Sequence, residues 1–300
     1  MEPIKELEIE GGRIEYRREG EGILILSCKV HSGRVVVPEK IENLPVTGLG
    51  KKAFLSAKPL KEVRLPEALR EIGDWAFAYC SLLESVWLPR ENLALGRGIF
   101  KECQRLAGIY LPDGDRVRQR QVGRLLGAVP VKLETDYLFS LREAGEGAWL
   151  ARFDQRLSEF LAQPDEEGYT KMVYCGEEDI VANMDYYLAR RRREKAELCF
   201  LRLINSLGLS REFEGTLSAY LCTHTKGCPS EAAWECVFQD HGNDREYYEA
   251  FTRAGCLTAG NYDGILLEMG EQYPEMKAYL MRYKSRNMEG TDFFASLSLD

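Results

Sequence analysis

Three segments between residues 60 and 112 carry one pattern at one spacing: Leu60-Lys-Glu-Val63-Arg-Leu65-Pro66, Leu83-Glu-Ser-Val86-Trp-Leu88-Pro89 and Leu106-Ala-Gly-Ile109-Tyr-Leu111-Pro112. Each proline follows the previous one by 23 residues. Other positions keep the same period, namely Leu49/Ile72/Leu95, Gly50/Gly73/Gly96 and Phe54/Phe77/Phe100. A fixed period of about 20 to 50 residues is typical of repeats that stack into a solenoid. The pattern therefore predicts a solenoid in this half of the chain.

One repeat predicts a short strand followed by turns. Val63 and Leu65 alternate with Arg64, so the two apolar side chains face the core and Arg64 faces outward. The pair Ala76-Phe77 predicts a short helical or 3₁₀ turn that places an aromatic ring in the core. No single repeat buries this apolar set alone, so neighbouring repeats must stack. We expect a right-handed solenoid with parallel strands near residues 34–37, 61–65, 84–88 and 107–111.

These residues resemble a known repeat family. The stretch Pro66-x-x-Leu69-x-x-Ile72-Gly73-x-x-Ala76-Phe77-x-x-Cys80-x-x-Leu83-x-x-Val86-x-Leu88-Pro89 is similar to the BspA-type leucine-rich repeat. The segment 37–54 resembles the usual first repeat of that family, and the resemblance extends over residues 34–112. Ala57 replaces the family's cysteine, and Arg97-Gly-Ile99-Phe100 departs from its Ala-Phe approach. The resemblance implies a recognition scaffold, often found on bacterial surfaces, and carries over no catalytic residues.

Composition and charge limit the classes of partner. The chain is 45% hydrophobic and 29% charged, which is ordinary for a soluble globular protein. Its net charge of -8 and pI near 5.3 argue against nucleic acid or an anionic membrane as the main partner. The longest apolar run in the first thirty residues is Ile23 to Leu26, so neither a secretory signal nor a spanning helix is visible. We expect no membrane contact and a cytoplasmic location, with the cell surface as the alternative if a signal has been removed.

The cysteines favour reduced thiols. Nine cysteines are an odd number, and they are scattered along the chain. Cys80 and Cys103 share one column of the repeat, where stacked turns bring them close enough for a disulfide. We nevertheless expect both to be free thiols in the core.

The period fails after Pro112, where Arg118, Gly123 and Lys132 occupy the columns of Ile, Phe and Val. The chain is therefore expected to be an α+β protein with four parts. They are a β-hairpin cap with two hairpins (1–33), the leucine-rich repeat solenoid (34–115), an irregular stacked-helix domain (116–288) and a tail (289–300), with order weakening from Ser285.

Helical spacing predicts the elements of the second half. The expected helices are 149–161, a pair at 179–188 and 194–207 joined by a basic link, 212–222, 230–240, 244–254, 262–271 and 274–284. The residues from Ala254 to Asn261 and the helices after them weakly resemble an ankyrin-type turn and helix pair, but the Thr-Pro-Leu-His signature is absent.

Several clusters carry side chains with chemical potential, and each has a structural explanation. Cys222-x-His224-x₃-Cys228-x₇-Cys236 holds soft ligands but lacks paired Cys-x-x-Cys knuckles, so we expect no structural zinc. The carboxylates at 177–179 and Asp185 are expected to cap a helix. His241-Gly-Asn-Asp244 predicts a turn and a helix cap. We expect no catalytic residue, no metal and no cofactor.

The strongest charge cluster is Arg190-Arg-Arg-Arg193 with Lys195. Such a run is able to meet an acidic partner, a phosphate or RNA. It has no interleaved aromatic residues and belongs to an acidic chain, so we expect a solvated helix junction.

The most informative positions are the outward columns of the expected strands. One column contains Val36, Arg64, Trp87 and Tyr110, and its neighbour contains Arg34, Glu62, Ser85 and Gly108. Solvent-facing strand positions are usually polar, whereas aromatic rings beside an arginine are typical of an interface hot spot. Arg64 is expected to lie over Trp87. Three explanations stay open, namely coverage by the helical domain, a separate partner and simple exposure.

The sequence thus predicts a non-catalytic protein-protein interaction scaffold whose partner is unknown. It would use the repeat strand face, the helical surface or both, with Glu62, Arg64, Trp87 and Tyr110 as the candidate partner-binding residues. The alternative is an enzyme or a nucleic-acid or phosphate-binding factor with its site in the helical half. The oligomeric state is left open.

Overall fold

The computed structural model describes residues 2–89, 93–112, 115–167, 169, 183–228 and 231–288. The chain forms two compact units, residues 1–156 and 157–300, which we describe separately. The domain limits expected from the sequence stay a prediction. The acidic cluster at 177–179 and the expected tail at 289–300 lie outside the described residues.

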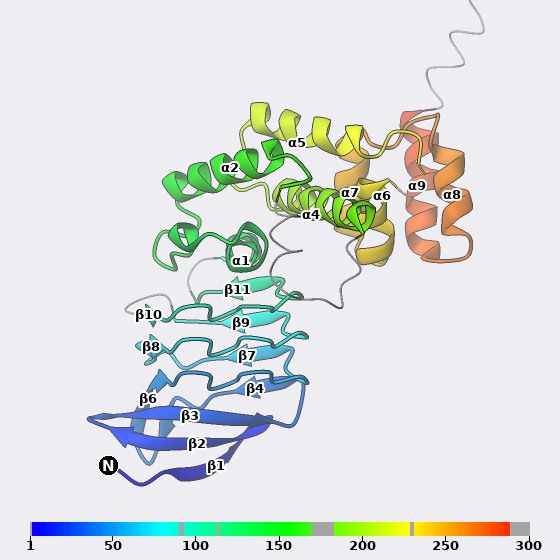
Figure 1. Cartoon of the computed structure of the whole chain (residues 1–300). Helices are drawn as coiled ribbons and strands as arrows, with labels where there is room; N and C mark the ends of the chain where they lie inside the picture. Colours follow the sequence, from blue (N-terminus) through cyan, green and yellow to red (C-terminus); the bar gives the residue numbers. More distant parts are fainter. Residues whose placement is uncertain are drawn as a thin grey trace, which may run out of the picture. The chain divides into compact units, whose positions relative to one another are not determined.

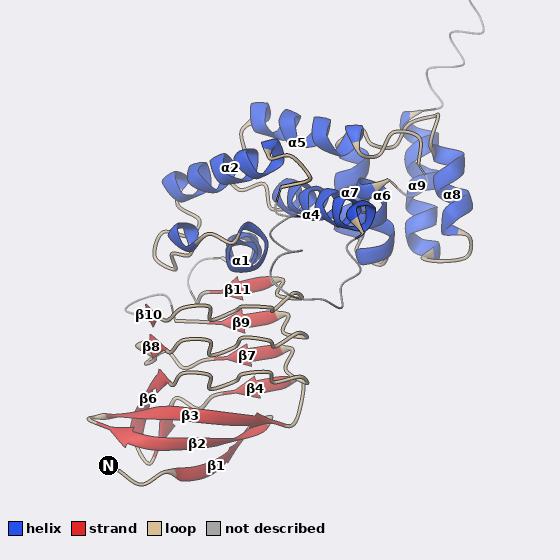
Figure 2. Cartoon of the chain, in the orientation of Figure 1, coloured by secondary structure: helices blue, strands red, loops and turns tan. Residues whose placement is uncertain are grey.

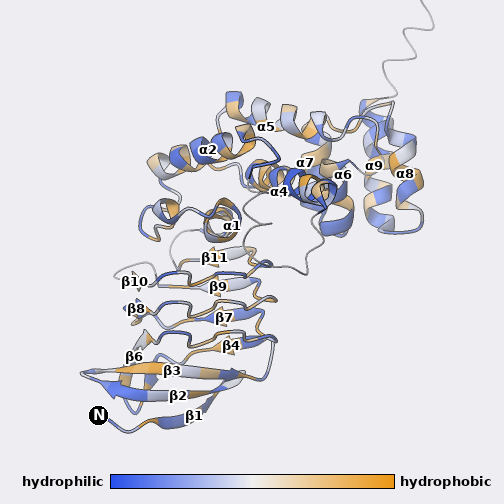
Figure 3. Cartoon of the chain, in the orientation of Figure 1, coloured by the Kyte–Doolittle hydropathy of each residue, from blue (hydrophilic) through white to orange (hydrophobic). Residues whose placement is uncertain are grey.

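The chain begins with an antiparallel meander of β1 (Lys5–Ile9), β2 (Gly12–Glu19) and β3 (Gly22–Val30) (Figure 1). Figure 3 shows that β1 is mostly hydrophilic, whereas the first part of β3 is hydrophobic. β3 then pairs in parallel with β6 (Leu44–Leu49), which also forms a short antiparallel pair with β5 (Lys40–Ile41). This part of the chain contains two hairpins, β1–β2 and β2–β3, which share β2. The first three strands, β1 to β3, extend one sheet of the solenoid. The next strand along the chain, at residues 34–36, belongs to the other sheet.

Two parallel sheets form the solenoid (Figure 2). The sheet with the longer strands consists of β4 (Arg34–Val36), β7 (Glu62–Arg64), β9 (Ser85–Trp87) and β11 (Gly108–Tyr110). These strands pair in parallel in the expected register. This prediction is confirmed. The other sheet continues from β6 through β8 (Glu71–Ile72) and β10 (Ala94–Leu95). Sequence reasoning recognised its inward residues but not its strands.

The core of the solenoid repeats along its axis. The rings of Phe54, Phe77 and Phe100 stack with centroid separations of 4.9 and 5.7 Å. The Cys80 thiol donates to the Phe54 carbonyl at 3.0 Å, and the Cys103 thiol donates to the Phe77 carbonyl at 3.1 Å. Both thiols are free, and burial raises the pKa of Cys80 to about 11 and that of Cys103 to about 12. Stacked aromatic rings and protonated cysteine thiols therefore join neighbouring repeats in the core.

The segment around Phe77 is a series of turns rather than a continuous helix. The Ala78 amide donates to the Trp75 carbonyl at 3.2 Å, which is the i→i+3 bond of the short turn expected at Ala76-Phe77. Trp75 and Tyr79 have φ angles of 58° and 61°, which lie in the left-handed region and interrupt any right-handed helix. The amide of Phe77 donates to the Ile99 carbonyl of the next repeat at 3.0 Å. The turn is thus held by its neighbour rather than by its own hydrogen bonds alone.

Helix α1 (Arg116–Ala128) packs against the last strand, β11. The Asp115 carboxylate caps it by accepting the amides of Val117 and Arg118, each at 2.9 Å. A Cβ atom at Gly127 would lie 2.8 Å from the Gly108 Cα atom. The glycines therefore allow the helix backbone to lie directly on the strand. The elements η1 (Val129–Leu133), η2 (Asp136–Leu138) and α2 (Gly147–Ala162) follow.

The second unit is helical in its described residues. It contains the end of α2, then α4 (Met184–Ile204), α5 (Arg211–Thr223), α6 (Ala232–Glu235), η3 (Cys236–Asp240), α7 (Arg245–Arg253), α8 (Tyr262–Met269) and α9 (Pro274–Asn287). Trp234 lies in its core, with ring contacts to Phe238, Tyr248 and Phe251.

Two expected helix limits in this unit are corrected. The pair at 179–188 and 194–207 is one helix from Met184 onward, without a break at the basic run. The last helix continues to Asn287, beyond the expected end at residue 284 and the expected start of disorder.

Candidate functional site

The outward column of the longer sheet forms a ladder of side chains, which we call the strand ladder: Arg64, Trp87 and Tyr110. The three residues are aligned on β7, β9 and β11. The guanidinium carbon of Arg64 lies 4.8 Å from the Trp87 ring centroid, so the expected cation–π contact is present. The rings of Trp87 and Tyr110 follow at 4.9 Å with an interplanar angle of 34°. Parallel pairing at the repeat spacing thus places one cation and two aromatic rings in a row.

The neighbouring column holds Arg64 in place. Glu62 accepts a hydrogen bond from the Arg64 Nε atom at 2.8 Å, and the Arg34 Nε atom lies 3.7 Å from the same carboxylate. These side chains are partly or largely exposed, so the ion pairs contribute little to stability. Their main effect is to orient the guanidinium over the indole.

The ladder is covered at one end and open elsewhere. A Cβ atom at Gly123 would lie 2.6 Å from Cδ1 of Tyr110, so α1 borders this ring within the first unit. Trp87 and Tyr110 are half-buried, and Arg64 is exposed. Coverage by a helix is therefore found for one side of Tyr110. Part of the indole and the arginine remain available in the described residues of this unit.

Residues 36–120 match the family model of the BspA type leucine rich repeat region, in six copies. This segment is a BspA-type leucine-rich repeat region. The match confirms the resemblance found over residues 34–112. Leucine-rich repeats commonly mediate protein-protein interaction, and the strand ladder lies on strands of the matched segment.

Two solved structures are similar to part of the chain. One is a leucine-rich repeat protein of T. pallidum, with 33% identity and a TM-score of 0.32 over 36% of this chain and 50% of that one. The other is a leucine rich cell surface protein from Faecalibacterium prausnitzii, with 20% identity and a TM-score of 0.31 over 36% of this chain and 32% of that one. The chain thus spans half or less of each. No curated protein matches it.

The repeat region carries a second group of exposed aromatic residues that sequence reasoning missed. Trp75 and Tyr79 lie in the turns between the two sheets and are 39% and 45% exposed. The Lys52 ammonium lies 5.5 Å from the Trp75 ring centroid, one repeat away. The same 23-residue columns contained the signal, because Lys52, Trp75 and Gly98 are equivalent positions.

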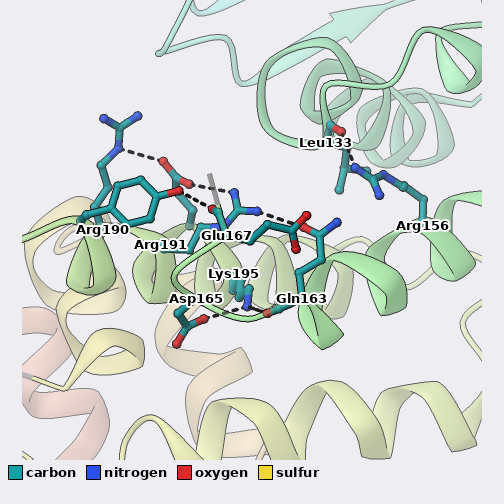
Figure 4. A network of polar contacts seen from close by, with 10 residues as sticks. Leu133, Arg156, Gln163, Asp165, Glu167, Arg190, Arg191 and Lys195 are labelled. Atoms are coloured by element: carbon teal, nitrogen blue, oxygen red, sulfur yellow. Dashed lines mark hydrogen bonds and ion pairs between the residues drawn. The ribbon is translucent and has the colours of Figure 1, made fainter. Parts of the chain in front are cut away.

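The basic run of α4 is paired within the second unit. Arg192 and Lys195 both contact the Asp165 carboxylate, at 2.8 and 2.7 Å, and Arg193 pairs with Asp240 at 2.5 Å. Figure 4 shows Lys195 beside Asp165 and Gln163, and the Lys195 ammonium also donates to the Gln163 carbonyl at 2.6 Å. The expected solvated helix junction is therefore wrong. All five basic residues lie inside one helix. Arg192, Arg193 and Lys195 bind carboxylates that are distant in sequence, whereas Arg190 and Arg191 pair with Glu194 of the same helix.

The other candidate clusters have local roles. The His224 ring stacks on Tyr220 at 4.1 Å, and the Cys228 thiol donates to the Thr225 carbonyl at 3.1 Å. Asp244 caps α7 by accepting the amide of Glu246 at 3.2 Å, as expected. Among the described residues, no group of three or more His, Cys, Asp or Glu side chains has an arrangement that could hold a metal ion.

The second unit has a cleft of about 380 Å³ next to α7 and α9. Its charged lining consists of Arg245, Glu275 and Arg282, without a nucleophile and base in contact. Arg245 lies 5.7 Å from the Tyr279 ring centroid at this cleft. None of the described helices combines the length and the apolar character needed to cross a membrane.

Proposed function

We propose that this protein is a non-catalytic interaction scaffold that binds a protein partner through the strand ladder. The observation that carries the proposal is the row formed by Arg64, Trp87 and Tyr110, whose spacing of 4.8 and 4.9 Å leaves the rings fixed before binding. Pre-ordered aromatic and arginine side chains lose little conformational entropy on association, which favours hot spots of this composition.

The charges around the ladder indicate the chemistry of the partner. Arg34, Glu62 and Arg64 alternate in sign along the exposed edge of the two columns. A partner with both a carboxylate and a basic group would therefore match this rim, while an apolar side chain would cover Trp87. Mixed charge of this kind gives specificity rather than raw affinity.

The alternative function, a phosphate or nucleic-acid site in the helical half, is not favoured by any observation. The basic run that suggested it is already bound by carboxylates of the same unit, notably Asp165 and Asp240. A phosphate would have to displace these partners.

The proposal is tested by capture followed by reconstitution. Proteins retained from the source cell by the wild type are compared with those retained by Trp87→Ala and by Tyr137→Ala, a control that removes an exposed aromatic side chain elsewhere in the first unit. A captured protein is then purified, and its dissociation constant is measured for all three chains. We expect Trp87→Ala to weaken binding by about 30-fold, the size of a hot-spot loss, and Tyr137→Ala to leave it unchanged. Equal affinity of the wild type and Trp87→Ala would contradict the proposal.

A further inference from the structure

The turns that carry Trp75 and Tyr79 form an ordered surface of their own. We call residues 50–61, 73–84 and 96–107 the turn surface. The Trp75 amide donates to the Arg97 carbonyl at 2.9 Å, and the Tyr79 amide donates to the Lys101 carbonyl at 2.7 Å. Neighbouring turns are therefore in register, about 4.8 Å apart. Equivalent side chains of successive repeats must lie in rows across this surface.

The two exposed rings lie at positions where each turn of the repeat has a left-handed backbone. Trp75 and Tyr79 have left-handed φ angles of 58° and 61°, which costs about 1–2 kcal/mol for a residue with a side chain. In the next repeat the position of Trp75 is filled by Gly98, with φ also 58°. Trp75 and Tyr79 are 39% and 45% exposed, so each ring is partly buried against the turns and partly available to a ligand. The equivalent residues Lys52, Ser56 and Glu102 have the same left-handed backbone, so this conformation belongs to every turn. The middle turn differs in presenting two partly exposed aromatic rings.

The turn surface is basic in a chain that is acidic overall. Its carboxylates are Asp74, Glu84 and Glu102, and its cations are Lys51, Lys52, Lys58, Lys61, Arg97, Lys101 and Arg105. All seven cations are exposed, and none forms an ion pair with another described residue. The chain as a whole carries a net charge of -8. The local excess of positive charge therefore attracts an anionic ligand to this surface.

The aromatic residues of the surface present hydrogen-bond donors. Among described residues, neither the Trp75 indole N–H nor the Tyr79 hydroxyl has a hydrogen-bond partner. The Lys52 ammonium lies over the indole ring, and the ring edge lies against Gly98, where a Cβ atom would be 3.1 Å from Nε1. Lys52 thus occupies one face of the indole ring, while the indole N–H has no hydrogen-bond acceptor among the described residues. This arrangement suits a carboxylate better than a nucleic-acid base, which requires a free ring face.

We propose that the turn surface binds a short acidic segment of a protein partner, in an extended conformation. Carboxylates of such a segment would meet Lys52 on the first turn and Arg97 and Lys101 on the third, on either side of the middle turn. The Trp75 indole, on the middle turn, would donate to one of them. The methylene groups of the acidic side chains would cover the exposed parts of the two rings. This site is independent of the strand ladder, which presents mixed charges on the strands.

The test uses the full chain and a fluorescein-labelled octaglutamate peptide, with binding followed by fluorescence anisotropy. The key variant combines Trp75→Gly with Tyr79→Ser, because the chain itself has Gly98 and Ser56 at the equivalent positions. Both replacements relieve or tolerate the left-handed backbone, which offsets part of the loss of the ring contacts. The unfolding temperature of the variant is measured first, to show that it is folded at the temperature of the binding assay. A second variant, Lys52→Glu with Lys101→Glu, reverses two charges of the surface.

We expect each variant to bind the peptide at least about tenfold more weakly than the wild type, and binding to weaken as salt rises from about 50 to about 300 mM. Trp87→Ala should bind the peptide like the wild type, which separates this site from the strand ladder. The proposal is overturned if the wild type does not bind octaglutamate. It is overturned as well if both variants bind octaglutamate as tightly as the wild type does. It is also overturned if a ten-nucleotide single-stranded DNA binds more tightly than the peptide and loses affinity in the same variants.

Discussion

The repeat region and the helical unit stabilise their interiors in different ways. In the repeat region, a buried side chain has an equivalent one turn away, as in the stack of Phe54, Phe77 and Phe100. The middle ring, Phe77, therefore contributes to two similar interfaces, and stability is approximately a sum over neighbouring repeats. The 23-residue period that aligns the buried rings also aligns the outward residues of successive strands. Rows of side chains on the surface therefore follow from the repeat itself.

The helical unit relies instead on contacts that occur once. Lys195 is 1% exposed and is held by Asp165 and the Gln163 carbonyl. Arg202 is fully buried and donates to the Asn205 carbonyl at 2.6 Å and the Leu207 carbonyl at 3.1 Å. A buried charge is tolerated only when such partners are in place. Loss of one partner in this unit therefore leaves a defect that no equivalent residue compensates.

The largest effect should come from the aromatic stack. We expect Phe77→Ala to lower the free energy of unfolding by about 3–5 kcal/mol, because it removes a fully buried ring that contacts rings on both sides. Denaturant unfolding followed by circular dichroism measures the loss. Phe77→Leu is the matched variant and should cost clearly less, since it retains most of the apolar volume. Similar costs for the two variants would show that the ring stack is not the stabilising feature.

A smaller effect, with a pH signature, is expected at the polar pair of the helical unit. Burial would raise the pKa of Asp165, but hydrogen bonds and charges from Lys195 and Arg192 outweigh it and lower that pKa. A carboxyl with a lowered pKa stabilises the folded state above its unfolded pKa of about 3.9, and this contribution is lost as the pH falls through the folded value. We expect Asp165→Asn to cost about 2–3 kcal/mol at neutral pH.

Unfolding free energies of Asp165→Asn and the wild type should therefore be measured between neutral pH and about pH 3. The difference between the two chains should begin to shrink below about pH 4, where Asp165 becomes protonated in the unfolded chain, and should go on shrinking as the pH falls through the lowered pKa of the folded state. Asp263→Asn is a useful control, because Asp263 is largely exposed and its ion pair with Lys284 has a separation of 4.0 Å. A difference for Asp165→Asn that stays constant with pH would refute the assigned role of its charge.

The close approach of α1 to the last strand gives the next effect. A Cβ atom at Gly127 would meet the Gly108 backbone at 2.8 Å, and backbone atoms have little room to move. Overpacking costs about 1–3 kcal/mol, and the gain in helix propensity from glycine to alanine offsets about 0.5–1 kcal/mol. We expect Gly127→Ala to cost about 1–2 kcal/mol. Gly215→Ala in α5, where nothing lies within 4 Å, should instead stabilise by about 0.5–1 kcal/mol. A stabilising Gly127→Ala would disprove the close contact.

The sequence predicted the structure well in the repeats, where the position of a residue in one repeat predicts the position of its equivalent in the next. The 23-residue period fixed the register of β7, β9 and β11, and with it the contact between Arg64 and Trp87. It missed the strands β8 and β10 because two residues are too few to show alternation. The turn conformation was also missed, since a left-handed Trp75 has no signal except the equivalent Gly98.

The helical unit was harder to predict because its decisive contacts join distant residues. When only local sequence is considered, a run of four arginines favours a solvent-exposed break between two helices. The run nevertheless continues α4, since Asp165 and Asp240 supply partners from 25 or more residues away. Tertiary pairing of this kind leaves no local pattern, so both the helix limits and the burial of Lys195 required the structure.

The smallest effect on stability, and the sharpest test of the comparison, is expected for Trp87→Ala. The indole is half-buried, and its removal deletes one cation–π contact and one ring contact, which together contribute about 1 kcal/mol, as well as the part of its apolar surface that is buried. Unfolding measured beside Phe77→Ala should show the far larger cost at the core position, although both residues belong to the same repeat. Two rings of one repeat then differ because one faces the interior stack and the other faces outward. If Trp87→Ala destabilises the chain as much as Phe77→Ala, the indole is part of the core and the strand ladder is a folding element. A small loss of stability combined with loss of the reconstituted partner would identify the ladder as a binding surface.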